Sequence, residues 1–457
     1  MLVEGSVINN TLIGKNEWLY LWQGGQRQFD FLTSRSSPSP QSITNFLNNI
    51  EDRVKFCQNN DIRYIHIVYP SKPVVMPENL PEFISGEVRS LFKRCYEDFI
   101  KKCLTESVLY PLDSLVKEKN SAPVFRQYDT HMTDYGNAIV SREILRHLGE
   151  NHDPLLFFKS QPQNRIGDLA KMADVKKTVV ENALKSISNV DQSWDNRAFL
   201  PGNTDNVVIV HNPNSASDKR LLALGDSFLR DGLSSLSTFY RDILYIRSDL
   251  FQKDAIALFA PDAIISANAE RYMCQISSDS DADGILLKCY GRANYHPSDA
   301  YVAAFNAQIG YRAYPKRYQN WAKKIKSLSF EGIGVGEPNN QIDFSDIDNG
   351  YMISSGTDPQ IIINESMLDK ELSYKLIFSI DSQHPGIFQI FYDNENNDKL
   401  FKFNEENSIK FDIKNGKNIF ECNIPKNRNS NSIRIDPVNF EGYFRINYLT
   451  AHLNFCD

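Results

Sequence analysis

The sequence predicts an α/β domain, with a mostly parallel sheet flanked by helices, followed by an all-β sandwich. Up to about residue 325, short apolar runs alternate with helical patterns, as in sheets whose strands are connected by helices. Beyond residue 328 these helical patterns stop, and short alternating runs are separated by Gly, Asn and Asp turns, as in an antiparallel sandwich. We therefore expect two domains, residues 1–325 and 326–457.

The composition is that of an ordinary globular protein. Of the 457 residues, 41% are hydrophobic and 23% are charged, which is enough apolar material for a large core. The formal net charge of −7 and the lack of any long Lys/Arg block argue against a nucleic-acid partner. No apolar run approaches the ~18 residues of a membrane span, so no transmembrane segment is expected. The sequence does not indicate a protein partner.

Cysteine usage and the first residues bear on the cellular compartment. The seven cysteines include no C-x-x-C pair, and Cys95 and Cys103 fall on predicted helical core positions, as in a reduced protein. Residues 1–6 have neither the basic nor the apolar region of a secretory signal. We expect a cytoplasmic protein; the alternative is a periplasmic protein whose export signal is absent from this chain.

The elements of the first domain follow from apolar periodicity. A short aromatic strand precedes a turn at Gly24-Gly25, and a helix is expected where apolar residues recur at helical spacing from Ile43 to Cys57. Residues 62–69 are apolar on both faces, as in a central parallel strand. The remaining expected elements, in chain order, are a helix over 88–103, a strand at 108–110, a short helix over 111–117, a strand at 124–125, a helix over 135–148, strands at 207–210, 221–224 and 243–246, a helix over 250–259, and a strand at 263–267.

Two further regions have a distinct character. Residues from about 150 to 205 are polar and less periodic, which indicates an insertion or lid. The clearest strands of the sandwich are 361–363, 374–380, 387–392, 409–413, 433–435 and 443–449.

The most informative motif is Gly225-Asp226-Ser227, which follows the apolar run 221–224 and precedes a helical pattern. A strand that ends in this way places its turn at the carboxyl edge of the sheet, where open α/β folds bind ligands. Ser227 would begin the helix, and its backbone N–H could stabilise an oxyanion there. Asp226 and Ser227 could equally serve only as helix caps. The motif therefore needs a partner base.

Asp129-Thr130-His131 supplies such a base roughly a hundred residues upstream. In an extended segment, residues i and i+2 point to the same side, so the carboxylate of Asp129 could orient the ring of His131. His131 could then take the proton of the Ser227 hydroxyl. The alternatives are a helix-entry histidine at 131 and a helix cap at 129. Together the three residues supply nucleophile, base and orienting group, which favours catalysis.

Five separated blocks give the sequence a specific resemblance. They are Gly14-Lys15-Asn16-Glu17-Trp18-Leu19-Tyr20, Tyr69-Pro70-Ser71-Lys72-Pro73, residues 128–136, Leu224-Gly225-Asp226-Ser227-Phe228, and Pro261-Asp262-Ala263-Ile264-Ile265 with Glu270-Arg271. Over about residues 8–275 the sequence resembles the alginate O-acetyltransferase-like SGNH hydrolase family. The resemblance implies an SGNH-like fold with Ser227 as acetyl-accepting nucleophile, His131 as base and Asp129 as its partner. Met132 departs from the family, because an aromatic residue usually follows its Asp-Thr-His.

Two basic residues are weaker candidates for substrate binding. Arg271 follows a strand end and could bind an anionic sugar or a cofactor phosphate, but an ion pair with Glu270 is the preferred explanation. Lys72 lies at the end of another strand, where a solvated loop lysine is the preferred explanation. The eight histidines are scattered without metal-ligand spacing, so we expect no metal and no bound cofactor.

The residues and the resemblance together predict an O-acetyltransferase. An acetyl group would pass through an acyl-serine to a hydroxyl of a surface polysaccharide or its precursor. Acetyl-CoA or another acetyl donor would be the co-substrate, and a polysaccharide or oligosaccharide the acceptor. The alternatives are an SGNH-type carbohydrate acetylesterase and a catalytically inactive carbohydrate-binding protein. The resemblance also makes carbohydrate binding by the sandwich plausible.

Overall fold

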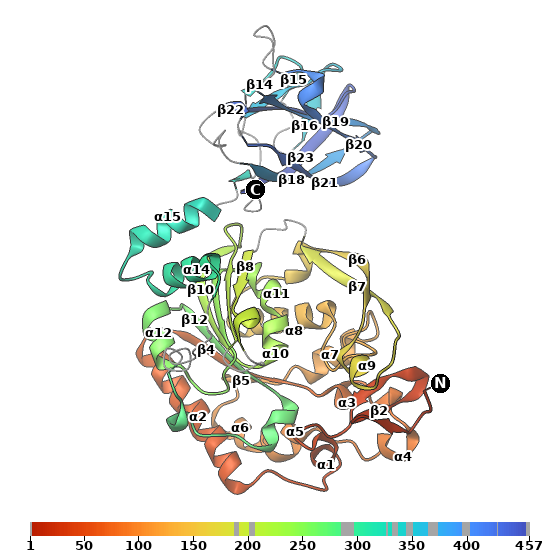
Figure 1. The fold of residues 1–457 in the computed structure, drawn as a ribbon, viewed down its shortest axis with the longest axis vertical. Helices are drawn as coiled ribbons and strands as arrows, with labels where there is room; N and C mark the ends of the chain where they lie inside the picture. The colour runs from red at the N-terminus through yellow and green to blue at the C-terminus, as the bar shows by residue number, and fades with distance from the viewer. Residues whose placement is uncertain are drawn as a thin grey trace. The chain divides into compact units, whose positions relative to one another are not determined.

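A computed structural model describes residues 2–186, 192–200, 206–284, 297–325, 328–330, 337–343, 351–363, 373–394, 403–426 and 428–453. The chain forms two compact units, one of residues 1–186 and 191–321 and the other mainly of residues 322–457 (Figure 1). Each unit has its own hydrophobic core. The domain limits of 1–325 and 326–457 stay a prediction. Within the described ranges, no helix is both long and apolar enough to cross a membrane.

The first unit is built on a seven-stranded mixed sheet with helices on both faces, which confirms the predicted α/β class. Five strands pair in parallel, and the last two pair antiparallel at one edge. The strands, in spatial order, are β5 (Val108–Leu109), β4 (Arg63–Tyr69), β12 (Ala263–Ala269), β10 (Ser217–Leu224), β11 (Tyr240–Ile246), β9 (Val207–His211) and β8 (Gln192–Asp195).

Helices cover both faces because the central strands are apolar on both sides. In β10, Leu221 and Ala223 face one core, whereas Leu222 and Leu224 face the other. The first face is covered by α7 (Leu112–Glu118), α8 (Asp134–His147), α10 (Ser227–Asp231) and α11 (Leu233–Ser237). The second face is covered by α2 (Pro40–Asn59), α12 (Lys253–Phe259) and α14 (Asp299–Ile309).

Two predicted elements differ from the structure. The single helix expected over 88–103 is two helices, α5 (Leu91–Cys95) and α6 (Glu97–Cys103). The chain leaves helical geometry at Tyr96, whose hydroxyl donates to the Met273 carbonyl at 2.6 Å. The strand expected at 124–125 is wrong, because Phe125 makes only an isolated bridge with Met132.

Smaller elements surround this sheet. The N-terminal residues form a three-stranded antiparallel sheet, with strands β1 (Val7–Ile8), β2 (Thr11–Ile13) and β3 (Leu19–Leu21). Further α-helices in the described ranges of this region are α1 (Gln28–Leu32), α3 (Lys72–Val75), α4 (Glu82–Ser85) and α15 (Pro315–Ile325). The short helix η5 (Glu270–Cys274) follows β12 at the carboxyl edge of the sheet.

The polar region after residue 150 contributes a hairpin separate from the main sheet. Its strands β6 (Phe158–Arg165) and β7 (Val179–Ser186) pair antiparallel, and the short helix α9 (Asp168–Met172) lies between them (Figure 1). We call residues 158–186 the arm. Its function as a lid, within the insertion predicted over about 150–205, stays a prediction.

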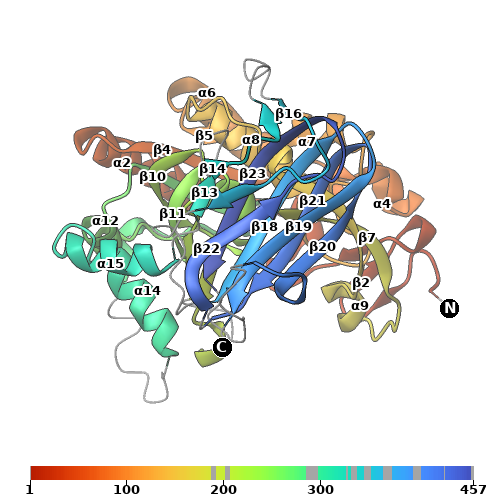
Figure 2. The ribbon, with the colours of Figure 1, turned by 90° about the horizontal axis from the view of Figure 1, so that it is seen from above.

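The second unit contains two antiparallel sheets, as predicted (Figure 2). Phe378 of β18 stacks on Phe388 of β19 with ring centroids 4.3 Å apart, so the sheets pack face to face. One sheet consists of β15 (Ile342–Asp343), β16 (Met352–Ser354), β23 (Gly442–Leu453), β18 (Tyr374–Ser382) and β21 (Gly416–Ile424), with β13 (Leu328–Phe330) paired to β23. The other consists of β14 (Glu337–Pro338), β17 (Ile361–Ile363), β22 (Arg428–Asp436), β19 (Gly386–Asn394) and β20 (Ser408–Ile413).

Candidate active site

The turn after β10 fixes the position of Ser227. Asp226 caps α10, because its Oδ1 accepts the Phe228 N–H at 2.9 Å. Its Oδ2 accepts the Ala269 N–H at 2.7 Å, which ties the turn to the end of β12. A Cβ atom on Gly225 would lie 3.0 Å from Ala267 of β12, a tighter contact than is usual, so glycine favours this close packing. The capping role is therefore carried by Asp226, and the Ser227 hydroxyl is available for another partner.

The structure brings Ser227, His131 and Asp129 together. The Ser227 Oγ lies 2.9 Å from His131 Nε2, and His131 Nδ1 lies 2.7 Å from Asp129 Oδ1. A carboxylate can only accept, so Nδ1 donates to Asp129 and Nε2 accepts from the serine hydroxyl. The same Asp129 Oδ1 accepts the backbone N–H of His131 at 2.9 Å. The arrangement has the geometry required of a nucleophile, a base and an orienting group.

The surroundings shift the pKa values of this pair apart. Burial opposes ionisation of Asp129, but hydrogen bonds from His131 and the Asp168 N–H hold its pKa well below the usual range. Burial also opposes protonation of His131. The hydrogen bond to Asp129 and the negative charges of Asp231, Asp129 and Asp168 outweigh that effect and raise the pKa of His131. The ring is thus a stronger base than an ordinary histidine.

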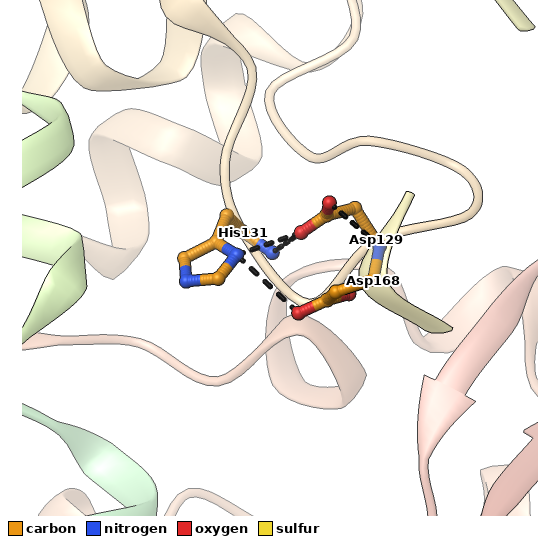
Figure 3. A group of neighbouring side chains, drawn as sticks. All are labelled: Asp129, His131 and Asp168. Atoms are coloured by element: carbon orange, nitrogen blue, oxygen red, sulfur yellow. Dashed lines mark hydrogen bonds and ion pairs between the residues drawn. The ribbon is translucent and has the colours of Figure 1, made fainter. Parts of the chain in front are cut away.

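Asp168 is a site residue that the sequence interpretation missed. It begins α9 in the arm, and its Oδ2 lies 3.5 Å from His131 Nδ1 (Figure 3). Burial and the charge of Asp129 raise the pKa of Asp168. The residue lies within the polar, aperiodic stretch taken as an insertion, and no motif connects it to Asp129-Thr130-His131. Only the polarity of that stretch could have pointed to it.

The same three side chains have the ligand types that a cation could use. One potential ligand atom from each of Asp129, His131 and Asp168 lies within 4.8 Å of the others. However, the His131 Nδ1 already donates to Asp129, and the other nitrogen faces Ser227. These hydrogen bonds account for the geometry of the group without an ion.

The prediction that Lys72 is a solvated loop lysine is wrong. The residue is only 5% exposed, and burial lowers its pKa to about 7. Its ammonium lies 2.6 to 3.0 Å from four backbone carbonyl oxygens, those of Leu19, Arg126, Gln127 and Asp129. These acceptors stabilise the charged form. Lys72 therefore connects the N-terminal sheet to the segment that carries Asp129.

The expected ion pair between Glu270 and Arg271 is also wrong. Glu270 is fully buried, and it accepts hydrogen bonds from two backbone N–H groups and two hydroxyls, those of Ser71, Phe92, Ser90 and Tyr110. The guanidinium of Arg271 instead lies 5.3 Å from the Phe228 ring centroid and 4.9 Å from that of Tyr272. Adjacent residues in a short helix point in different directions, which explains the error.

A pocket opens beside this group of residues. Its lining includes Ser71, Lys72, Thr130, Phe228 and Arg271. Thr130 and Phe228 are the chain neighbours of His131 and Ser227, so the pocket lies against the catalytic candidates. Both predicted basic residues line it. Backbone carbonyls surround the Lys72 ammonium, whereas the Arg271 guanidinium has no carboxylate partner among the described residues. The predicted oxyanion donor, the N–H of Ser227, lies at the first position of α10.

Comparison with solved structures finds matches at low sequence identity. AlgX from Pseudomonas aeruginosa is 13% identical, with 97% of this chain and 94% of that chain covered and a TM-score of 0.40. PatB1 from Bacillus cereus is 12% identical, with 58% and 97% covered and a TM-score of 0.41. The O-acetyltransferase domain of Pseudomonas putida AlgJ is 16% identical, with 61% and 97% covered and a TM-score of 0.39.

Sequence comparison identifies the family of the first unit. No curated protein sequence matches the chain. Residues 11–221 match the family described as the SGNH hydrolase-like domain of the acetyltransferase AlgX. The matched region contains Asp129 and His131 and ends just before Ser227. The resemblance stated from the five sequence blocks is confirmed: residues 11–221 of this chain match the SGNH hydrolase-like domain family of the acetyltransferase AlgX.

Proposed function

We propose that this protein is an O-acetyltransferase that moves an acetyl group through Ser227 to a hydroxyl of a surface polysaccharide or its precursor. The observation that carries the proposal is the continuous hydrogen-bonded chain of Ser227, His131 and Asp129, with distances of 2.9 and 2.7 Å. The match of residues 11–221 to an acetyltransferase domain supports the same reaction class.

The first half-reaction forms the acyl-enzyme. The Ser227 Oγ bonds to the acetyl carbonyl carbon while its proton passes to His131 Nε2. The tetrahedral intermediate then collapses, the bond to the donor's leaving group breaks, and the leaving group takes the proton from His131. Asp129 stays ionised throughout and stabilises the imidazolium. The Ser227 N–H is the proposed donor to the oxyanion.

The second half-reaction transfers the acetyl group to the acceptor. A sugar hydroxyl loses its proton to His131 Nε2 as its oxygen bonds to the acetyl carbon. The bond to Ser227 Oγ then breaks, and the serine oxygen recovers the proton. Water can replace the sugar in this step, which is the acetylesterase alternative. In the proposed scheme acetyl-CoA is the donor for a cytoplasmic protein, and an acetylated membrane partner for an exported one.

Arg271 is the proposed binding residue for an anionic group of the donor or acceptor. Its guanidinium lines the pocket beside Phe228, and it has no carboxylate partner within the described ranges. A direct substrate contact by Lys72 has less support, because backbone carbonyls already surround its ammonium. The second unit is the proposed site of polysaccharide contact.

The acyl-serine can be tested with an activated acetyl ester and acetyl-CoA, each with and without an oligosaccharide acceptor. We expect a 42 Da adduct on Ser227, the mass of an acetyl group replacing a hydrogen, and acetylated sugar as product. Ser227→Ala should lower the rate by about 10⁴-fold or more, because the nucleophile is removed. Mass spectrometry of protein and sugar measures both results.

Three outcomes separate the alternatives. Acetylated sugar supports the transferase. Acetyl release that sugar does not change, without acetylated sugar, would overturn the transferase in favour of the esterase. If the protein forms no acetyl adduct and releases no acetate with any donor, but still binds carbohydrate, the result would support the inactive carbohydrate-binding protein. Ser227 is 7% exposed and a change to alanine is small, so thermal unfolding of the variant should match the wild type.

A further inference from the structure

The arm contacts the Asp129 segment through its backbone. A Cβ atom on Gly167 would overlap the carbonyl of Tyr128, so only glycine permits this approach. The same carbonyl accepts the Ala170 N–H at 3.2 Å. The Asp168 N–H donates to Asp129 Oδ2 at 3.0 Å. The start of α9 is thus held directly against the residues that precede His131.

The carboxylate of Asp168 is fixed on the Nδ1 side of the imidazole. Its Oδ1 accepts the Thr130 N–H at 2.8 Å, and its Oδ2 accepts the Thr130 hydroxyl at 2.5 Å. The Oδ2 atom also lies 3.5 Å from His131 Nδ1. The Nδ1–H therefore faces two carboxylates, Asp129 at 2.7 Å and Asp168 slightly farther away.

Charged contacts hold the strands of the arm in place. Arg126, three residues before Asp129, contacts Glu181 of β7 at 3.1 Å and Asp134 of α8 at 2.7 Å. The Leu184 N–H of β7 donates to Asp134 Oδ2 at 3.1 Å. Both ends of the Asp129–His131 segment are thereby tied to the arm that carries Asp168.

We infer that Asp168 is a positioning residue for the proposed acyl transfer: from the arm, it holds the Asp129–His131 segment and adds a second carboxylate to the Nδ1 side of the imidazole. This inference rests on the proposed function for its catalytic consequence, but the geometry stands without it. When Ser227 gives its proton to His131, the imidazolium forms between two negative groups. Asp168 thus stabilises the charged base and fixes the ring toward the serine.

Other charges also face the imidazole and must be held constant in a test. Asp231 of α10 contributes a negative charge on the serine side. Two cations lie near the same residues: the Lys72 ammonium is 2.9 Å from the Asp129 carbonyl, and Arg271 lies across the Phe228 ring. Of the charged groups named here, only Asp168 belongs to the arm. A substitution of Asp168 therefore changes the charge that the arm places near His131 and leaves the other three charges in place.

The inference predicts a measurable change when the charge of Asp168 is removed. Asp168→Asn can keep a hydrogen bond from the Thr130 N–H while it loses the negative charge. We expect the pKa of His131 to fall, the acidic limb of kcat/KM for acetyl release to move to lower pH, and the plateau to drop roughly 3- to 30-fold. This loss is smaller than the 10²–10⁴-fold contribution typical of the base itself. The pKa is measured by NMR on protein with ¹³C-labelled histidine, assigned by the signal lost in His131→Gln.

Asp174→Asn is the matched control. Asp174 lies six residues further along the arm and is exposed, and its left-handed backbone (φ 54°) suits asparagine. It removes the same charge from the same element, so its His131 titration and pH profile should follow the wild type. Asp168→Ser is a second charge-removing variant, with a hydroxyl that can accept the Thr130 N–H, for use if the asparagine variant does not fold.

The outcomes separate this inference from the proposed function. A His131 titration and a pH profile in Asp168→Asn and Asp168→Ser that coincide with the wild type would overturn the role of Asp168, even if Ser227 forms an acyl-enzyme. If Asp168→Asn lowers the pKa of His131 but the wild-type protein never acetylates Ser227, the placement of Asp168 beside the imidazole is upheld and its role in acyl transfer is not. Equal shifts in Asp168→Asn and Asp174→Asn would reduce the effect to net charge and would also overturn the inference.

Discussion

Among the described residues of the first unit, two histidine–aspartate pairs have the same Nδ1–carboxylate distance but lie in different environments. In one, His131 Nδ1 lies 2.7 Å from Asp129; in the other, His211 Nδ1 lies 2.7 Å from Asp242. The first pair is partly exposed, and the second nitrogen of its ring faces Ser227. The short contact is therefore not in itself a sign of catalysis.

The second pair is part of a buried polar network. Asp242 is fully buried, and its carboxylate also contacts four further side chains, those of Arg220 at 3.0 Å, Gln308 at 2.5 Å, Tyr318 at 2.7 Å and Arg241 at 3.3 Å. The ring of His211 packs on Trp321. These contacts join α14 and α15 to strands β9 and β11 of the sheet. What distinguishes the His131–Asp129 pair is that the second ring nitrogen faces the Ser227 hydroxyl and that the pair is partly exposed.

The largest expected effects come from replacing the aspartate by asparagine in each histidine–aspartate pair. Asp129→Asn should lower kcat/KM by about 10⁴-fold, because the ring loses its correct tautomer. Its cost in stability should be smaller than that of Asp242→Asn, because Asp129 is partly exposed whereas Asp242 is fully buried. Asp242→Asn should lower the free energy of unfolding by about 3–5 kcal/mol, because it leaves the Arg220 guanidinium buried without its counter-charge. Steady-state kinetics and denaturant unfolding measure the two quantities. A stable but inactive Asp242→Asn protein would contradict the distinction.

The cations beside the two pairs offer a second test. Arg220 contacts the carboxylate of Asp242, whereas Lys72 contacts the backbone carbonyl of Asp129. Lys72→Met should cost about 2–4 kcal/mol, because buried carbonyls lose their donor. It should also lower kcat/KM by roughly 10- to 100-fold, because Asp129 is less firmly placed. Lys171→Met, on the exposed side of α9, is the control. Unchanged kinetics in Lys72→Met would show that the carbonyl contacts serve stability alone.

The smallest expected effect is that activity and stability depend on pH in different ways. The pKa of His131 is raised, so its contribution to stability is present below about pH 6.5 and is lost as pH rises through the raised value. The pKa values of Asp129 and Asp242 are lowered, so their contributions are present above about pH 4 and are lost as pH falls further. Activity requires neutral His131 and should fall as pH drops through its raised pKa, while the fold persists.

Activity and thermal unfolding measured over the same pH series test this separation. We expect an interval between about pH 4 and the pKa of His131 in which the protein is folded and inactive. Restoring the pH should restore the activity at once. If inactivation coincides with unfolding, activity is lost because the fold is lost and not because His131 is protonated. That result would contradict the predicted separation.

Local sequence signals predicted the frame of the site well. The apolar run before Gly225 and the helical pattern after Ser227 specify a strand, a turn and a helix, and the structure has all three. In the second unit, the predicted strand Ile361–Ile363 is found with the same limits. These features depend on neighbouring residues, so periodicity and turn chemistry are sufficient to find them.

Contacts between distant segments were not predictable in the same way. The environment of Lys72 depends on carbonyls near residues 19 and 127, which no local pattern connects. Glu270 turns into the interior toward Ser71 and away from its neighbour Arg271. Asp168 reaches His131 only because the arm folds back onto Tyr128. In each case the sequence shows the residue type, and the tertiary fold decides its partner.

The arm leaves and rejoins the rest of the chain at paired positions, since Phe158 lies opposite Ser186 across β6 and β7. A hairpin with adjoining ends can be exchanged as one cassette without lengthening or shortening the chain around it. On the proposal that Asp168 stabilises protonated His131, replacing residues 158–186 would change the pH dependence of the proposed reaction without substituting Ser227, His131 or Asp129. Acid tolerance would then be a property that can be grafted separately from the chemistry.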